Sequence, residues 1–147
     1  LASGEMKKAT GATICLHQND LELWKNLELQ CRMFGVAYVP VPMPDYWLKD
    51  EEKLLVGQVS AVALHTPGHT PGSMSFHFPV DNVVLAGDTL FRGSIGRTDL
   101  WGGDFDAIEQ SIRERLYTLK DTTVVVTGHG PETEIGVEKE TNQFFRL

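Results

Sequence analysis

Two proline-glycine pairs interrupt the chain at residues 65–72, whose sequence reads HTPGHTPG. An apolar run at 59–64 leads into this stretch, and a strand-like run at 73–78 follows it. Because proline fixes φ and lacks a backbone N–H, neither a helix nor a strand can continue through the pairs. The pattern therefore predicts two strands joined by a tight loop that carries His69. A histidine held on such a loop has few rotamers, which suits a metal ligand.

The composition is that of a globular protein with one domain over residues 1–147. Hydrophobic residues make up 41% of the chain and charged residues 22%, which is an ordinary balance. A net charge of −7 argues against a nucleic-acid-binding protein and against an anionic membrane as a partner. We expect a cytoplasmic protein, because no apolar run reaches the length of a membrane span and no signal peptide opens the chain. Cys15 and Cys31 are expected to be buried thiols in a reducing compartment, not a disulfide.

The spacing of the other apolar residues predicts alternating helices and strands. Asn19 and Glu22 have the spacing of a capping box, and Asp104 or Asp106 is expected to cap a later helix. Strands that alternate with helices in the second half favour an α/β fold. We expect helices over 3–10, 21–34, 104–119 and 136–145, strands over 12–16, 54–56, 59–64, 73–78, 83–86 and 123–127, and an ordered glycine-rich loop over 91–103.

Three predicted strand ends each carry a candidate metal ligand: His69, Asp88 and His129. Each has a glycine neighbour in the sequence. Glycine allows close backbone approach and positive φ, so that three loops can converge on one point. Imidazole and carboxylate groups are ligands that zinc, iron and manganese accept. The remaining histidines, His17, His65 and His77, belong to no such motif, and we expect them to be ordinary structural residues.

The motifs that contain these residues resemble those of the metallo-β-lactamase superfamily. The matching stretches are HTPGHTPGS at 65–73, VLAGDTLFRGSIGRTD at 84–99 and TGHGPETEIGVEKETNQFF at 127–145. Within the superfamily they are most similar to the single-domain glyoxalase II-like, or hydroxyacylglutathione hydrolase-like, enzymes. The resemblance implies an αββα sandwich, in which two facing sheets are covered by helices.

The resemblance also implies a site and a reaction. His69 would bind a first metal ion, Asp88 would bridge two, and His129 would bind the second. The ions would be zinc, with iron or manganese as alternatives. A metal-bridging hydroxide would attack the carbonyl of a small-molecule thioester such as an acyl-glutathione, and the metals would stabilise the oxyanion. Arg97 occupies the place of a basic residue that faces the substrate; the alternative is a surface arginine paired with Asp99 or Asp104.

The family pattern includes an HxHxDH stretch upstream of His69, which supplies its remaining metal ligands. Residues 1–64 contain His17 alone. We therefore expect that the chain begins just after this motif, that the first strands of the amino-terminal sheet are missing, and that activity is impaired. Apolar surface left by those strands would need a cover, and we expect a homodimer that buries the exposed sheet.

Two other functions stay open. A mononuclear iron persulfide dioxygenase of the same superfamily uses two histidines and an aspartate, and shares a stretch like Gly96 to Asp99. The sequence GPET at 130–133, followed by a short helix, favours the hydrolase branch instead. A protein with the same fold and no catalytic activity is the third possibility. The acyl group and the thiol of the substrate are not specified by the sequence.

Overall fold

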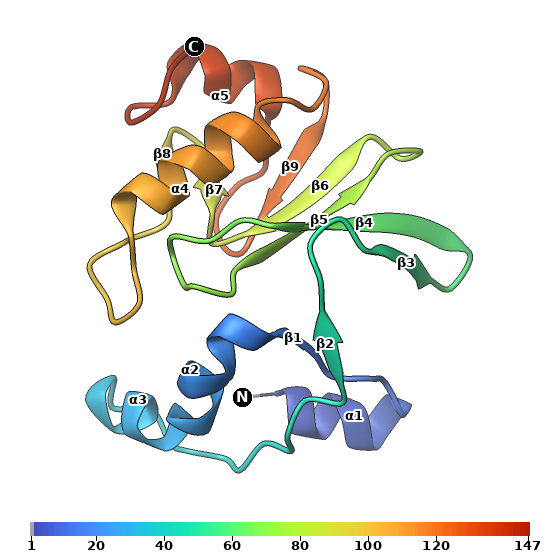
Figure 1. Cartoon of the computed structure of the whole chain (residues 1–147), viewed down its shortest axis with the longest axis vertical. Helices are drawn as coiled ribbons and strands as arrows, with labels where there is room; N and C mark the ends of the chain where they lie inside the picture. The colour runs from blue at the N-terminus through green and yellow to red at the C-terminus, as the bar shows by residue number, and fades with distance from the viewer. Residues whose placement is uncertain (1) are drawn as a thin grey trace. The chain divides into compact units, whose positions relative to one another are not determined.

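The computed structural model describes residues 2–147, and the chain divides into two compact units, Leu1–Leu48 and Lys49–Leu147 (Figure 1). The prediction of a buried thiol is confirmed for Cys31 and wrong for Cys15, which is exposed. No helix within residues 2–147 combines the length and the apolar character needed to cross a bilayer. The expectation of a single domain stays a prediction.

The first unit begins with helix α1 (Ser3–Thr10), which ends where the sequence predicts. Gly11 has a φ of 72°, and its N–H donates to the carbonyl of Lys7 at 2.8 Å, a common way to end a helix. Strand β1 (Cys15–His17) pairs in parallel with β2 (Tyr46–Leu48). β1 starts later than predicted, because the N–H of Ile14 donates to the Asp45 carboxylate at 2.9 Å and not to a neighbouring strand.

The helix predicted over 21–34 is broken at Asn26. It consists of α2 (Leu21–Lys25) and α3 (Leu27–Met33), preceded by a 3₁₀ turn at Gln18–Asp20. The Asn26 side chain donates to the Glu22 carbonyl at 2.8 Å, and such local bonds compete with regular helix. The predicted capping box does not start α2, whose N-cap is Asp20 without a side-chain cap hydrogen bond. The His17 side chain caps the preceding 3₁₀ turn.

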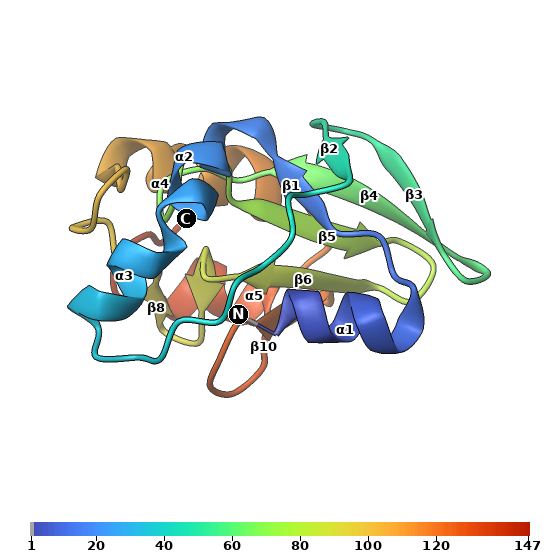
Figure 2. The same cartoon turned by 90° about the horizontal axis from the view of Figure 1, so that it is seen from below.

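The second unit is built on a six-stranded sheet with the order β10-β9-β6-β5-β4-β3, most of which is visible in Figure 2. β6 and β9 are parallel, and the other neighbours are antiparallel. The hairpin predicted around Gly57 is present, with a φ of 63° at that residue. The strands are β3 (Lys53–Val56), β4 (Val59–His65), β5 (Met74–Phe78), β6 (Val83–Gly87), β9 (Val124–Thr127) and β10 (Thr133–Glu134).

Helices lie against one face of this sheet (Figure 1). α4 (Phe105–Ser111) starts at Asp104, whose carboxylate accepts from the N–H of Ala107 at 2.9 Å, and it continues as a π-helical turn, Ile112–Leu116. α5 (Ile135–Thr141) is shorter than predicted. The Asn142 side-chain oxygen accepts from the N–H of Phe144 at 2.9 Å and turns the chain out of the helix.

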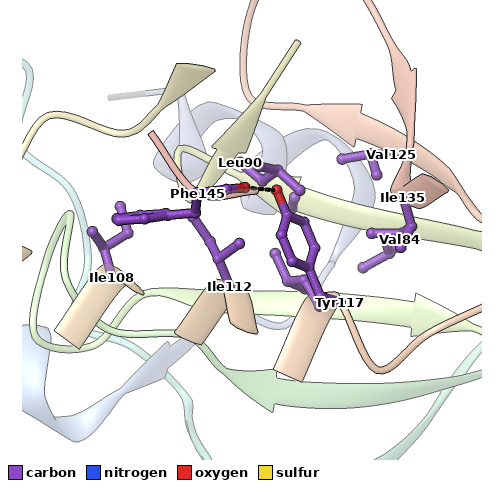
Figure 3. Packing of buried hydrophobic residues seen from close by; sticks show 10 residues of the cluster. Val84, Leu90, Ile108, Ile112, Tyr117, Val125, Ile135 and Phe145 are labelled. Carbon is purple, nitrogen blue, oxygen red and sulfur yellow. Dashed lines mark hydrogen bonds between the residues drawn. The ribbon is translucent and has the colours of Figure 1, made fainter. Parts of the chain in front are cut away.

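The core of the second unit fills the space between these helices and the sheet (Figure 3). Val84 pairs with Val125 in the register of β6 and β9, so both side chains point to the helix-covered face. Tyr117 closes the core, and its hydroxyl donates to the carbonyl of Phe145 at 2.9 Å. The cluster comprises Val84, Ala86, Leu90, Ile108, Ile112, Leu116, Tyr117, Val125, Ile135 and Phe145.

The loop predicted over 91–103 is ordered and starts inside a small hairpin. β7 (Leu90–Phe91) pairs antiparallel with β8 (Ser94–Ile95) around Gly93, which has a φ of 69°. The mixed α/β fold predicted from the alternation of elements is therefore confirmed.

Candidate metal centre

The loop that carries His69 connects β4 to β5 and is closed at its base. The N–H of Thr66 donates to the carbonyl of Ser73 at 2.9 Å. Gly68 has a φ of 131°, and a Cβ added there would lie 2.4 Å from the backbone nitrogen of Ile108. Only glycine allows the loop to approach the start of α4 so closely, and this contact fixes the residue next to His69.

Buried hydroxyl groups tie this loop to the segment that follows Asp88. Thr66, which is fully buried, has its Oγ1 atom 2.9 Å from the Ser75 hydroxyl and 3.3 Å from the Thr89 hydroxyl. Ser111 donates to the carbonyl of Pro67 at 2.7 Å. Buried polar groups in a satisfied network hold one geometry, so the His69 and Asp88 loops are fixed relative to each other.

His69 presents its Nε2 atom to Asp88. Its Nδ1 atom lies 2.9 Å from the backbone carbonyl oxygen of Arg97. Because a carbonyl can only accept, Nδ1 carries the proton and Nε2 keeps its lone pair in the neutral ring. Nε2 lies 3.6 Å from Oδ2 of Asp88. Two ligands of one zinc ion, each at about 2.1 Å and at a tetrahedral angle, lie about 3.4 Å apart. The donor atoms of this pair therefore fit a single divalent ion.

Glycines crowd around Asp88 at the end of β6. A Cβ added to Gly128 would lie 2.0 Å from Oδ1 of Asp88, and one added to Gly96 would lie 1.8 Å from its backbone oxygen. The N–H of Gly128 also donates to the carbonyl of Gly87 at 2.8 Å. Of the glycine neighbours singled out in the sequence, Gly68 and Gly128 thus have a steric reason, and the β9 loop reaches Asp88 because Gly128 has no side chain.

His129 lies on the third loop and is exposed. Its ring packs against that of Phe91, with the centroids 4.5 Å apart and the planes tilted by 32°. Thr127 donates its hydroxyl proton to the carbonyl of His129 at 2.8 Å. Phe91 therefore connects the third loop to the β7–β8 hairpin, a contact that the sequence spacing does not reveal.

The three predicted ligands line one cavity of about 420 Å³. Within residues 2–147 no three His, Cys, Asp or Glu side chains are close enough to hold a metal together, so His69 and Asp88 form a pair and His129 stays outside it. The complete lining is His69, Asp88, Phe91, Arg92, Ser94, Ile95, Gly96, Arg97, His129, Gly130 and Pro131.

Arg97 lines the cavity, but its guanidinium is engaged elsewhere. It donates to both carboxylate oxygens of Asp99 at 2.8 Å. The Arg97 hydrogen bonds lower the pKa of Asp99 to about 2. The guanidinium therefore follows the second expectation, a surface arginine paired with Asp99. The backbone carbonyl of Arg97 orients His69.

The histidines set aside in the sequence are not among the residues that line this cavity. His65 has its Nε2 atom 2.9 Å from the Pro71 carbonyl oxygen, and His77 lies in β5 with a pKa lowered by burial and by Lys120. Phe91 and Arg92 were missed by the sequence reasoning. The signal available was their place beside Asp88 in the motif at 84–99, where only Arg97 was singled out.

Comparison with known proteins places the chain in a family. The model of the metallo-beta-lactamase superfamily matches residues 1–129. The chain belongs to this superfamily. The mixed α/β structure matches the superfamily fold, and relatives named as hydrolases support a metal-dependent hydrolase at the level of the family.

Two relatives of known sequence match along almost all of the chain. A probable metallo-hydrolase of Bacillus subtilis, YqgX, is 36% identical over 144 residues, which are 97% of this chain and 68% of the relative. The hydroxyacylglutathione hydrolase GloC of Haemophilus influenzae is 37% identical over 145 residues, with the same coverage of 97% and 68%.

Among solved structures, a similar one is that of TTHA1623 in a di-iron-bound form. It is 39% identical to this chain, with a TM-score of 0.89. The match spans 98% of this chain and 70% of the TTHA1623 chain. The predicted family and its fold are confirmed by these comparisons. The identity of the metal and the roles of single residues stay predictions.

Proposed function

We propose that this chain is a glyoxalase II-like hydrolase whose reaction is thioester cleavage with the help of a divalent metal, and that this activity is impaired because residues 1–64 hold no HxHxDH stretch. The observation that carries the proposal is the 3.6 Å approach of His69 Nε2 to Asp88 Oδ2 in the cavity that His129 also lines. The name of the Haemophilus relative supports an acylated glutathione as the substrate. We propose zinc as the metal, and iron or manganese as alternatives with the same ligand preferences.

The chain's own residues would each have a limited task. His69 and Asp88 would hold the metal, His129 would approach it from the third loop, and the carbonyl of Arg97 would keep His69 in the tautomer that can bind. A bound ion would lower the pKa of a water molecule and polarise the substrate carbonyl. The cavity of about 420 Å³ has the size of a small-molecule site, which suits the acyl group and the adjoining sulfur.

The test is thioester cleavage by the chain after removal of metal with a chelator and reconstitution with zinc, iron or manganese. Release of the free thiol from an acyl-glutathione is expected only with metal. Asp88→Asn and His129→Gln are expected to lower the rate more than about hundredfold, since each would remove a proposed ligand. His77→Gln serves as the control, because His77 is outside the cavity lining. Equal rates for Asp88→Asn and the unaltered chain would refute the proposal.

The persulfide dioxygenase remains the second candidate, and one observation favours it. The donors that line the cavity are two histidines and one carboxylate, the residue types that non-haem iron oxygenases use for a single ion, and His129 would have to move toward His69 and Asp88 to complete such a set. Metal analysis and oxygen uptake with a glutathione persulfide would separate the two functions. Oxygen consumption with one iron per chain, and no thioester cleavage, would favour the dioxygenase. A chain that binds no metal and shows neither activity would favour the non-catalytic alternative.

The expected homodimer also stays a proposal. In the second unit, helices cover one face of the sheet, and the other face carries apolar side chains such as Phe76, Leu85 and Val126 in register. Light scattering over a range of protein concentrations tests it, and a mass of one chain at high concentration would rule it out.

A further inference from the structure

The cavity that His69, Asp88 and His129 line also carries two arginines, although the chain has a net charge of −7. The charge of Arg97 is balanced by Asp99 through two hydrogen bonds of 2.8 Å. Arg92 is exposed, and the structure of residues 2–147 gives its guanidinium no ion pair and no hydrogen bond. The cavity therefore holds one arginine whose donors are available to a ligand.

The backbone beside Arg92 is held by a buried carboxylate. The N–H of Gly93 donates to Oε2 of Glu138 at 2.9 Å, and Glu138 has no exposed surface. The side chain of Asn142 donates to the carbonyl of Ser94 at 3.0 Å and to Glu138 at 2.8 Å. The tip of the β7–β8 hairpin is thus anchored to α5, and the base of Arg92 is fixed before any ligand arrives. Such preorganisation lowers the entropy lost on binding.

Acidic residues near Arg92 do not neutralise it. Arg92 also lines a second cavity, of about 340 Å³, together with Glu132 and Glu134. Neither glutamate lies within ion-pair distance of Arg92 in the described part of the chain. The only acidic residue in the lining of the first cavity is Asp88, whose carboxylate faces His69. An anion that enters the first cavity would therefore find the Arg92 guanidinium as an open partner.

We propose that Arg92 binds a carboxylate of the substrate, so that the cavity selects thioesters whose thiol or acyl part is anionic. This proposal rests on the proposed thioester hydrolysis and adds the residue that recognises the substrate's charge. A guanidinium suits this task because its planar array of donors matches the two oxygens of a carboxylate. Arg92 would act in binding and specificity, away from the reacting carbonyl.

The test measures binding without catalysis. S-methylglutathione is a thioether that has no carbonyl at the sulfur and cannot be cleaved there, and its diethyl ester lacks both carboxylates. Calorimetric titration of the full chain is expected to give at least about fivefold tighter binding of the acid than of the ester, as a partly exposed charge pair would. Arg92→Gln should bring this ratio within about twofold of unity. Lys53→Gln, which removes an equal charge from β3 at the far edge of the sheet, should leave the ratio unchanged.

Several results would overturn the proposal. They are equal binding of acid and ester by the unaltered chain, binding of neither probe, a preserved ratio in Arg92→Gln, or an equal loss in Lys53→Gln. A ratio lost in Arg97→Gln and kept in Arg92→Gln would assign the recognition to Arg97. The proposed hydrolysis is measured separately by thiol release, so a chain that binds the acid through Arg92 and cleaves no thioester would disprove the hydrolysis alone.

Discussion

The Nδ1 atom of His69 lies 2.9 Å from the backbone carbonyl oxygen of Arg97, a residue 28 positions further along the chain. The contact determines which nitrogen of His69 keeps its lone pair, and that nitrogen faces Asp88. Histidines that bind metals usually have their other nitrogen held in this way. The loop of residues 96–99 is therefore part of the candidate centre even though it supplies no ligand atom.

Because His69 and Asp88 face each other, we predict that the affinity for a metal ion depends on both residues. We expect His69→Ala and Asp88→Asn each to weaken zinc binding at least about tenfold, because each removes a donor atom. The measurement is competition for zinc with a coloured chelator at fixed pH. His77→Gln is the matched control and should keep the affinity of the unaltered chain. Unchanged affinity in both ligand variants would place the metal elsewhere.

We predict that a side chain at position 128 would displace the carboxylate of Asp88. A Cβ at this position would lie 2.0 Å from Oδ1 of Asp88, so Gly128→Ala should displace the carboxylate and weaken zinc binding at least about tenfold. Overpacking is expected to lower the free energy of unfolding by about 1–3 kcal/mol as well.

Gly130→Ala separates this steric effect from backbone strain. Gly130 has a φ of 83° and open space around its Cα, so alanine there should lower the free energy of unfolding by about 1 kcal/mol. Zinc affinity should change less than in Gly128→Ala. A similar loss of affinity in the two variants would contradict the role assigned to Gly128.

We predict that the buried carboxylate of Glu138 stabilises the folded chain. It accepts hydrogen bonds from Thr133 at 2.6 Å, Gly93 at 2.9 Å and Asn142 at 2.8 Å. Glu138→Ala would leave the Thr133 hydroxyl and the Gly93 N–H without this partner and would remove one of the two acceptors of the Asn142 amide. We expect the free energy of unfolding in urea to fall by about 3 kcal/mol. The exposed Glu134→Ala should change it by less than about 0.5 kcal/mol. Equal unfolding midpoints for the two variants would show that the network contributes little.

Tyr117 predicts a pH dependence of stability at alkaline pH. Burial, with a smaller contribution from Glu138, raises the pKa of Tyr117 from 10.0 to about 12. Below pH 10 the hydroxyl is protonated in both the folded and the unfolded chain. Between pH 10 and 12 the unfolded chain loses the proton first, so this contribution to stability is lost as pH rises through that window.

Tyr117→Phe tests this dependence by urea unfolding at pH 8, 10 and 11. The variant should be about 1 kcal/mol less stable at pH 8, because the hydrogen bond to Phe145 is lost. Its stability should also fall less steeply above pH 10 than that of the unaltered chain. Tyr38→Phe, at an exposed residue, should leave both quantities unchanged. Parallel curves for the unaltered chain and Tyr117→Phe would disprove the assignment.

Local signals in the sequence predicted most elements because the local and tertiary preferences agree there. Gly11 ends α1 and Gly57 turns the β3–β4 hairpin, as glycines that supply positive φ should. Asp104 caps α4 for a similarly local reason. The break at Asn26 was missed, because a side chain that bonds to its own preceding turn competes with helix without changing the apolar period.

The candidate site was predicted in part. The flanking glycines pointed to His69, Asp88 and His129, and all three line one cavity. The support around them was hidden, since it comes from residues far apart in the chain. Glu138 holds Gly93 across 45 positions, and Ser111 holds Pro67 across 44.

The sequence by itself determined the kinds of elements, the loops that end in possible ligands and the family to which the chain belongs. The elements and loops depend on residues close together in the chain, where φ, ψ and hydrophobic period act directly, and the family is indicated by three short motifs. The tertiary structure decided which arginine is available, which nitrogen of His69 faces Asp88 and why Gly128 must be glycine. Those outcomes depend on contacts between distant segments, whose distances are fixed only when the core between the sheet and its helices has packed.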